Sequence, residues 1–420
     1  MKYFFPIYLS IFFACAGKAF IVQPIDGING EIEIVEFDSD GNSYVLSNTN
    51  TVRHLYKLNL AKEIQWIIDN IGYVWQILIN PQNDVYFLSD EDSIFNYNYL
   101  GIIREDDLHV EKIISKLGNT RMMMDGDGNI FYNGENGIFM LRPNSKTPMQ
   151  IKNLEGWRYN GGQVFAVDSI GNVYFGVQSI SSDQLCSIAV VTKEAKEEEI
   201  PYATRYNTEI GYRMSFFEID ENNGLWAFTS SSYFSQIINF SNGVVEGIVL
   251  DYNYEQHIAK AVKNRIYIVS ITDHSDTAPT YFITLNGTVG EIPDLNNVTK
   301  DVFKNTKIVA DKDGNTYFGS YYPYDKGAVV LIKPDGVNTT GIDFGDTVNV
   351  LSMMLDENED LWVGTDGQGI YRVKKGETIP EIATRELSSI YTGYININKK
   401  TNEVFIFSRY GLYFVDNSSN

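Results

Sequence analysis

Asp125-Gly-Asp-Gly-Asn-Ile-Phe131 decides the fold, because related stretches recur along the whole chain. Each copy joins an Asp-containing turn to an apolar strand with an aromatic residue. In such a turn the Asp side chain bonds its own backbone, and Gly or Asn accepts the left-handed conformation that a tight hairpin needs. The clearest other copies are Asp38-Ser-Asp-Gly-Asn-Ser-Tyr44, Asp168-Ser-Ile-Gly-Asn-Val-Tyr174 and Asp311-Lys-Asp-Gly-Asn-Thr-Tyr317.

Weaker copies complete the series, and their aromatic residues set its period. Successive aromatic positions are 41 to 52 residues apart, which is the length of a four-stranded propeller blade. The chain therefore predicts an all-β fold, a single closed β-propeller of nine four-stranded blades, or of eight if one weak copy is not a blade. The nine aromatic anchors are Tyr44, Tyr86, Phe131, Tyr174, Trp226, Tyr267, Tyr317, Trp362 and Phe405.

The strand pattern within a unit also predicts how the ring ends. Third strands are expected at 137–141, 369–373 and 411–415, and a polar fourth strand at 197–200, within an acidic run read as an outer edge. The last unit stops after its third strand, while residues 20–24 precede the first unit as an orphan strand. Pairing the two would complete the last blade and remove exposed sheet edges.

The first residues have the pattern of a secretory signal. Lys2 gives a positive start, residues 4–13 are apolar but too short to span a bilayer, and small residues follow. We expect cleavage near Ala19, which makes residues 1–19 a signal peptide and residues 20–420 the propeller; a lipoprotein modified at Cys15 is the alternative. The mature chain then keeps one cysteine, Cys186, in an apolar run that predicts a small buried side chain.

Charge and histidine spacing argue against several functions. The formal net charge is −21, which repels phosphates, so we expect no nucleic-acid binding, and no later apolar stretch predicts membrane insertion. The four histidines are scattered and predict no metal site, cofactor or catalytic triad. The Asp-x-Asp-Gly-Asn turns at 38, 125 and 311 could suggest calcium, but a strand follows each at once and no closing Glu is present, which favours a plain hairpin.

Three stretches resemble known repeats. Leu361-Trp-Val-Gly-Thr-Asp-Gly-Gln-Gly-Ile-Tyr-Arg-Val373 resembles the propeller repeat of bacterial two-component regulators, and residues 38–58 are similar to an NHL-type repeat. Both resemblances imply architecture and not chemistry. Phrases such as Asn136-Gly-Ile-Phe139 are similar to secreted insect propellers of the ommochrome-binding type, which implies a small aromatic pigment-like ligand.

Tyrosines gather where each unit begins. Counting back 13 to 15 residues from an anchor reaches the loop before the innermost strand, at one mouth of a propeller, and the loop between second and third strands lies on the same face. Tyr and Arg there offer amphipathic contact surface, although Tyr could equally pack between blades. The candidate binding residues are Tyr73, Trp157, Arg158, Tyr159, Tyr212, Arg213, Tyr254, His257, Tyr322, Tyr324 and Tyr391.

We therefore predict a secreted, monomeric binding module that holds a small molecule or an extracellular protein at this tyrosine-rich mouth. The alternatives are a lactonase-like hydrolase with a metal in the channel and a pigment carrier. The candidate glycosylation sites are Asn239, Asn286, Asn297, Asn338 and Asn417.

Overall fold

The computed structural model describes most of the chain from residue 22 to residue 415. The described ranges are 22–49, 52–92, 97–105, 107–117, 121–134, 137–159, 165–180, 186–207, 213–220, 222–230, 235–241, 244–250, 256–262, 265–271, 277–278, 280–284, 288–292, 298–299, 307–324, 327–336, 338–344, 348–384, 392–408 and 411–415. The expected signal peptide, residues 1–19, lies outside them.

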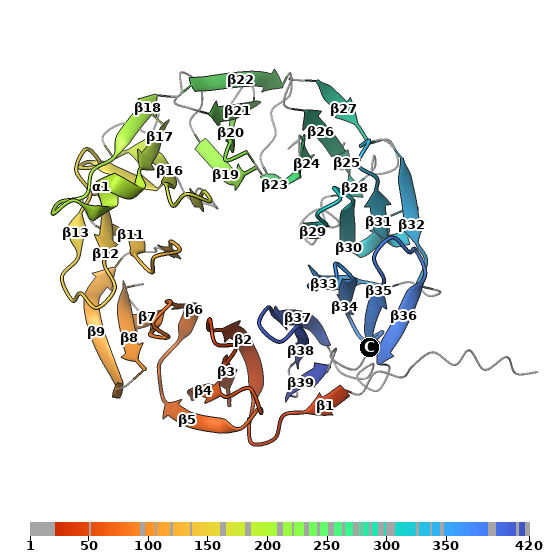
Figure 1. The fold of residues 1–420 in the computed structure, drawn as a ribbon, viewed down its shortest axis with the longest axis horizontal. Coiled ribbons are helices and arrows are strands. Elements are labelled where there is room, and N and C mark those ends of the chain that lie inside the picture. The colour runs from red at the N-terminus through yellow and green to blue at the C-terminus, as the bar shows by residue number, and fades with distance from the viewer. Residues whose placement is uncertain are drawn as a thin grey trace, which may run out of the picture.

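The regular secondary structure of the described residues is strand apart from one short helix, in small antiparallel sheets that follow the chain order. We number these sheets as repeats 1 to 9. Figure 1 shows the repeats side by side around a ring, with first strands toward the middle and fourth strands at the rim. Each sheet therefore presents one end of its strands to each face of the ring.

The first five repeats occupy residues 31–250. Their strands, with one short helix, are β2 (Glu31–Phe37), β3 (Ser43–Asn48), β4 (Arg53–Leu58) and β5 (Ile64–Asp69) in repeat 1; β6 (Val74–Ile79), β7 (Val85–Asp92), β8 (Tyr97–Arg104) and β9 (Asp107–Leu117) in repeat 2; β10 (Met122–Met124), β11 (Ile130–Gly134), β12 (Gly137–Leu141) and β13 (Met149–Gln150) in repeat 3; β14 (Trp157–Tyr159), β15 (Phe165–Val167), β16 (Val173–Ser179), β17 (Cys186–Val191), α1 (Lys193–Glu197) and β18 (Thr204–Asn207) in repeat 4; and β19 (Arg213–Ile219), β20 (Leu225–Ser230), β21 (Ser235–Ser241) and β22 (Val244–Leu250) in repeat 5.

The last four repeats continue in the same way and include one additional strand pair, β25 (Thr277–Ala278) with β28 (Val298–Thr299). Their strands are β23 (Gln256–Val262), β24 (Arg265–Ile271), β26 (Thr280–Thr284) and β27 (Val289–Glu291) in repeat 6; β29 (Lys307–Ala310), β30 (Thr316–Tyr324), β31 (Gly327–Ile332) and β32 (Thr339–Ile342) in repeat 7; β33 (Val350–Leu355), β34 (Leu361–Thr365), β35 (Ile370–Val373) and β36 (Pro380–Thr384) in repeat 8; and β37 (Thr392–Asn398), β38 (Glu403–Ser408), β39 (Gly411–Val415) and β1 (Val22–Pro24) in repeat 9.

The aromatic anchors that the period predicts are core residues. All nine are buried, and each lies on the strand next to the innermost one; in repeat 4 this strand is β16, which pairs with both β14 and β15. They pack in clusters that join one sheet to the next, as where Tyr44 of repeat 1 and Phe87 of repeat 2 share one cluster. The repeat is therefore also the unit of core packing, because a single sheet cannot bury its own faces.

The predicted Asp turns are present, and Asp168 shows their common pattern. Its Oδ1 accepts the N–H groups of Ile170 (3.1 Å) and Asn172 (2.8 Å), and its Oδ2 accepts the hydroxyl of Tyr174 at 2.9 Å. The fourth turn residue, Gly171, has φ +91°, where a side chain is strained. N–H and O–H donors occupy both carboxylate oxygens, as in a plain hairpin turn. Asp38, Asp125, Asp220 and Asp356 accept the same pair of N–H groups.

The expected fourth strand at 197–200 is wrong. Helix α1 ends at Glu197, the first residue of the expected strand, and the fourth strand of the sheet is β18, further along the chain. The helix is capped by Thr192, whose hydroxyl accepts the N–H of Ala195 at 3.3 Å. Lys, Glu and Ala favour helix. Lys196 of this helix is buried, with Nζ 2.6 Å from Oδ2 of Asp125 in repeat 3. The acidic side chains of the run, Glu194 and Glu197 to Glu199, are exposed as expected, but they lie in and after a helix, and Lys196 between them joins repeat 4 to repeat 3.

Repeat 9 combines the two ends of the described chain. β1 pairs antiparallel with β39, with Val22 opposite Val415 and Pro24 opposite Tyr413, as the orphan strand predicted. Ile25 donates its N–H to the Leu412 carbonyl at 2.9 Å. Because bonded pairs alternate along an antiparallel ladder, Pro24 falls at a position where no N–H is required.

Cys186 is buried at the start of β17, as predicted, and burial raises the pKa of its thiol to about 11. It therefore stays protonated at neutral pH. Within the described residues, no helix is long and apolar enough to cross a membrane.

Candidate functional site

The predicted tyrosine-rich mouth is only partly covered by the described residues. Tyr212, Tyr254 and Tyr391 lie outside them. The others lie at one end of the sheets: Tyr73 just before β6, Trp157, Arg158 and Tyr159 in β14, Arg213 in β19, His257 in β23, and Tyr322 and Tyr324 in β30. First-strand starts and second-strand ends meet there, as Arg158 opposite Gln178 shows.

Tyr73 projects at this mouth but has an arginine against its ring. Its side chain is 52% exposed, and the Arg53 guanidinium carbon lies 4.0 Å from the ring centroid. Glu33 holds that guanidinium from the other side, at 2.7 Å from Nε and 3.0 Å from Nη2. Arg53 therefore covers part of the ring, while about half of the side chain stays exposed at the mouth.

Trp157 is similar. It is half-buried against the core of repeat 4, and the Arg205 guanidinium carbon lies 4.3 Å from its ring centroid. Arg205 is fixed by a bond from its Nε to the Asn153 carbonyl at 3.1 Å. Neighbouring Arg158 is exposed. The core cluster beneath the ring also includes residues of repeats 3 and 5, which agrees with the competing interpretation that aromatic residues at this mouth pack between blades.

Two of the five candidate glycosylation sites lie within the described residues. Asn239 lies in β21 and Asn338 is exposed before β32, with its N–H donated to Asp335 at 2.9 Å. Asn286, Asn297 and Asn417 lie outside the described residues.

A pocket of about 690 Å³ opens at the opposite end of the sheets, beside the Asp turns. It lies where repeats 8, 9 and 1 meet. Its lining residues are Glu36, Phe37, Asp38, Ser39, Met354, Asn396, Ile397, Asn398, Lys399 and Lys400. The volume is within the range of roughly 300–1,000 Å³ that small-molecule sites have.

Three lining residues occupy the same register position in successive repeats. The residue of the innermost strand opposite the aromatic anchor is Met354 in repeat 8, Asn396 in repeat 9 and Glu36 in repeat 1. Opposite residues of an antiparallel pair point to the same face of a sheet. The pocket is thus built by one repeated position with three different side chains. The remaining repeats have Leu78, Met123, Ala166, Glu218, Lys260 and Val309 there.

Asn396 joins the two ends of the described chain at this pocket. Its Nδ2 donates to the Val35 carbonyl at 2.7 Å, and its Oδ1 accepts the N–H of Ile397 at 2.9 Å. Asn398 adds a second link, from its Nδ2 to the Gly41 carbonyl at 2.7 Å. Both amides therefore hold repeat 9 against repeat 1 and position the walls of the pocket.

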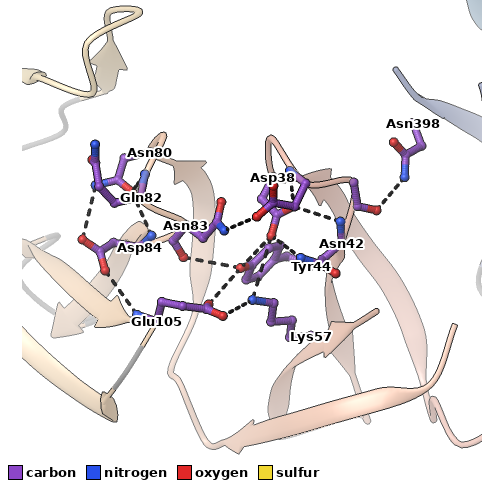
Figure 2. A network of polar contacts seen from close by, with 12 residues as sticks. Asp38, Asn42, Tyr44, Lys57, Asn80, Gln82, Asn83, Asp84, Glu105 and Asn398 are labelled. Atoms are coloured by element: carbon purple, nitrogen blue, oxygen red, sulfur yellow. Dashed lines mark hydrogen bonds and ion pairs between the residues drawn. The ribbon is translucent and has the colours of Figure 1, made fainter. Parts of the chain in front are cut away.

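Figure 2 shows how the wall at the Asp38 turn is fixed from its other side. The Tyr44 hydroxyl donates to Oδ2 of Asp38 at 3.2 Å, and Lys57 Nζ lies 2.5 Å from Oε1 of Glu105 in repeat 2. Asn83 of repeat 2 also donates its Nδ2 to Oδ2 of Asp40 at 3.0 Å. The turn is tied to repeat 2 through Asp40 and to repeat 9 through Gly41, while the Asp38 carboxylate is occupied by donors of its own repeat.

Glu36 differs from Asp38. Among the described residues it has no hydrogen-bond or ion-pair partner, although its side chain is accessible in the pocket. Desolvation by the surrounding protein raises the pKa of its carboxyl above the usual 4.5. An unpaired carboxylate in a concave site is available to a ligand, and perturbed acids of this kind are concentrated at functional sites.

Sequence reasoning missed this pocket because it counted back to the loops of the mouth. The position that builds the pocket lies eight residues before the anchor in most repeats, as in Glu36 before Tyr44 and Met354 before Trp362. Comparing that one position across the repeats would have shown polar side chains among apolar ones. Within the described residues, no cluster of three or more His, Cys, Asp or Glu could hold a metal ion.

Comparisons with known proteins support the fold. No protein-family model and no curated protein matches the chain. A solved structure described as the eukaryotic initiation factor is 9% identical over 94% of this chain and 92% of its own, with a TM-score of 0.58. Virginiamycin B lyase from Staphylococcus aureus, solved with quinupristin, is 12% identical over 94% and 98%, with a TM-score of 0.40. Dipeptidyl peptidase 4 from Porphyromonas gingivalis is 9% identical over 90% and 56%, with a TM-score of 0.48. Of these three, the initiation factor has a TM-score above 0.5, and at 9% identity its likeness extends to the fold alone.

Proposed function

We propose that the chain is a secreted binding module, built as a closed nine-bladed β-propeller, that holds a small molecule. The nine consecutive repeat sheets support the blade number, and the pairing of β1 with β39 supports closure. Secretion rests on the signal-like pattern of residues 1–19. The lactonase-like and pigment-carrier interpretations stay predictions from the sequence.

The unpaired carboxylate of Glu36 in the seam pocket carries this proposal. We use "seam pocket" for the pocket where repeats 8, 9 and 1 meet. The Glu36 side chain is exposed in the pocket and has no partner among the described residues, so its carboxylate is free to pair with a cationic group of a ligand. Apolar Phe37, Met354 and Ile397 line the same space, which suits a small organic molecule. The tyrosine-rich mouth remains a second candidate surface for a protein partner.

A matched pair of turn variants tests the pocket. Ser39 and Ser169 both follow the Asp of their turn and both are exposed, but of the two only Ser39 lines the seam pocket. The mature protein is screened against a small-molecule library by thermal shift, and hits are measured by calorimetry. We expect Ser39→Trp to weaken binding at least tenfold and Ser169→Trp to leave it unchanged. Hits that bind Ser39→Trp as tightly as the native protein would show that the ligand lies elsewhere.

A further inference from the structure

The charged groups at the seam pocket point to a particular class of ligand. We propose that the pocket binds a zwitterionic small molecule, with an ammonium group against Glu36 and a carboxylate against Lys399 and Lys400. This inference rests on the proposed function and narrows it. Three separate observations carry it: Glu36 has no partner among the described residues, Lys399 and Lys400 have no ion-pair partner among them, and the lining is partly apolar.

The first observation is the contrast between the two acids of the pocket. The Asp38 carboxylate accepts the N–H groups of Asp40 and Asn42 at 3.0 and 2.9 Å and the Tyr44 hydroxyl at 3.2 Å. Glu36, two residues earlier, has no such partner among the described residues. A cation is the group that pairs most strongly with a carboxylate that has no other partner.

The second observation is that Lys399 and Lys400 are unpaired. Several lysines near the turns are neutralised, as in Lys62 with Glu403 (2.5 Å) and Lys375 with Asp313 (2.7 Å). Lys399 and Lys400 are exposed and have no ion-pair partner among the described residues. In a chain of net charge −21, two free ammonium groups at the rim of a pocket favour a negatively charged ligand group.

The third observation is the apolar lining. Phe37 is half-buried, Ile397 is buried and Met354 adds a thioether. These side chains give the pocket an apolar part beside its charged groups. The ligand that fits has an ammonium and a carboxylate joined by a short apolar chain, as in an amino acid with its two charges separated or a short peptide.

The test uses four probes that share one carbon chain: 6-aminohexanoate, hexylammonium, hexanoate and hexanol. Binding to the mature protein is measured by calorimetry. We expect 6-aminohexanoate to bind tightest, at least tenfold tighter than hexanol. Glu36→Gln should weaken 6-aminohexanoate and hexylammonium at least tenfold and leave hexanoate unchanged. The double variant Lys399→Gln/Lys400→Gln should weaken 6-aminohexanoate and hexanoate and leave hexylammonium unchanged.

Matched controls lie at equivalent positions of other repeats. Glu218→Gln changes the residue opposite the anchor in repeat 5, and Lys312→Gln changes an exposed lysine directly after a turn Asp. Neither should alter the binding of any probe. Circular dichroism confirms folding, and the exposed lysine pair keeps the test valid if Glu36→Gln does not fold.

The two proposals fail in different ways. Equal binding of hexanol and 6-aminohexanoate, or hexylammonium binding that Glu36→Gln does not change, would overturn the zwitterion inference. So would a pocket that binds other library compounds, in a manner sensitive to Ser39→Trp, but none of these four. If no library compound binds the native protein in a way that Ser39→Trp weakens, the proposed function itself is overturned.

Discussion

The side-chain amide of Asn398 donates a hydrogen bond of 2.7 Å to the backbone carbonyl of Gly41, across 357 residues of sequence. Asn398 is buried and its Oδ1 also accepts the N–H of Lys400 at 3.0 Å. One side chain thus shapes the turn of repeat 9 and holds it against the turn of repeat 1.

Asn398→Asp should lower the free energy of unfolding by about 2 kcal/mol. The new side chain keeps the oxygen that accepts the Lys400 N–H, but it has no donor for the buried Gly41 carbonyl. Urea unfolding of the mature protein gives the value. Asn144→Asp is the control, because Asn144 is exposed and its Oδ1 already acts as an acceptor. Equal stability of the two variants would mean that the Asn398–Gly41 bond does not hold the ring.

Gln23→Pro should destabilise the protein by about 1–2 kcal/mol, whereas Gln23→Ala should have almost no effect. The Gln23 side chain is exposed, so only the backbone changes matter. Ile25 and Leu412 are hydrogen-bonded, and bonded pairs alternate along an antiparallel ladder, so the pair of Gln23 and Phe414 is also a bonded one. Proline at position 23 would remove the N–H that this pair requires. Thermal and urea unfolding measure the difference. Indistinguishable variants would contradict closure through β1.

Tyr174→Phe should cost about 1 kcal/mol, and Tyr86→Phe should be neutral or stabilising. The Tyr174 hydroxyl donates to Asp168 at 2.9 Å, while the buried Tyr86 hydroxyl, near Asn80 and Asp84, makes no hydrogen bond of normal geometry within the described residues. Removing the Tyr174 hydroxyl takes one of the two donors from Oδ2 of Asp168, which keeps only Asn172 Nδ2, but removing an unpaired hydroxyl relieves a desolvation penalty. Urea unfolding midpoints of the two variants give the difference. A larger loss of stability in Tyr86→Phe than in Tyr174→Phe would contradict the role assigned to the Tyr174–Asp168 bond.

Lys196→Met should cost about 3–5 kcal/mol, because it leaves the fully buried Asp125 carboxylate without its cation. Lys374→Met is the matched control. Lys374 pairs with Glu381 at 2.6 Å, but both side chains are largely exposed to water, so its loss should change the free energy of unfolding far less than the loss of Lys196. Similar losses in urea unfolding would show that α1 does not hold repeats 3 and 4 together.

Glu36→Gln should raise the stability of the ligand-free protein at pH 7. Because burial raises the pKa of Glu36 in the folded state above its usual 4.5, folding disfavours the charged form. The native protein therefore gains stability as pH falls from the folded pKa toward that of the unfolded chain, and the variant does not. The difference in stability between Glu36→Gln and the native protein should therefore shrink as pH falls through that interval. Thermal unfolding between pH 4 and pH 8 checks this, and an advantage that grows as pH falls would contradict it.

The sequence by itself determined the repeat. The spacing of Tyr44, Tyr86 and the later anchors predicted the second strands, and Asp168 with Gly171 predicted the turns, because both depend on local chemistry. It failed at 197–200, where Thr192 caps a helix and Lys196 finds a buried partner in another repeat. A lysine in a polar run gives no local sign that a distant carboxylate will receive it.

Only the tertiary structure decided which side chains meet. Asn396 bonds the Val35 carbonyl from 361 residues away, and Glu36 and Met354 share a pocket although they belong to opposite ends of the chain. These contacts depend on the ring bringing repeats 8, 9 and 1 together, a long-range arrangement that local propensity does not encode. Period and turn chemistry therefore predicted the fold, whereas the candidate site came from the packing of one repeat against the next.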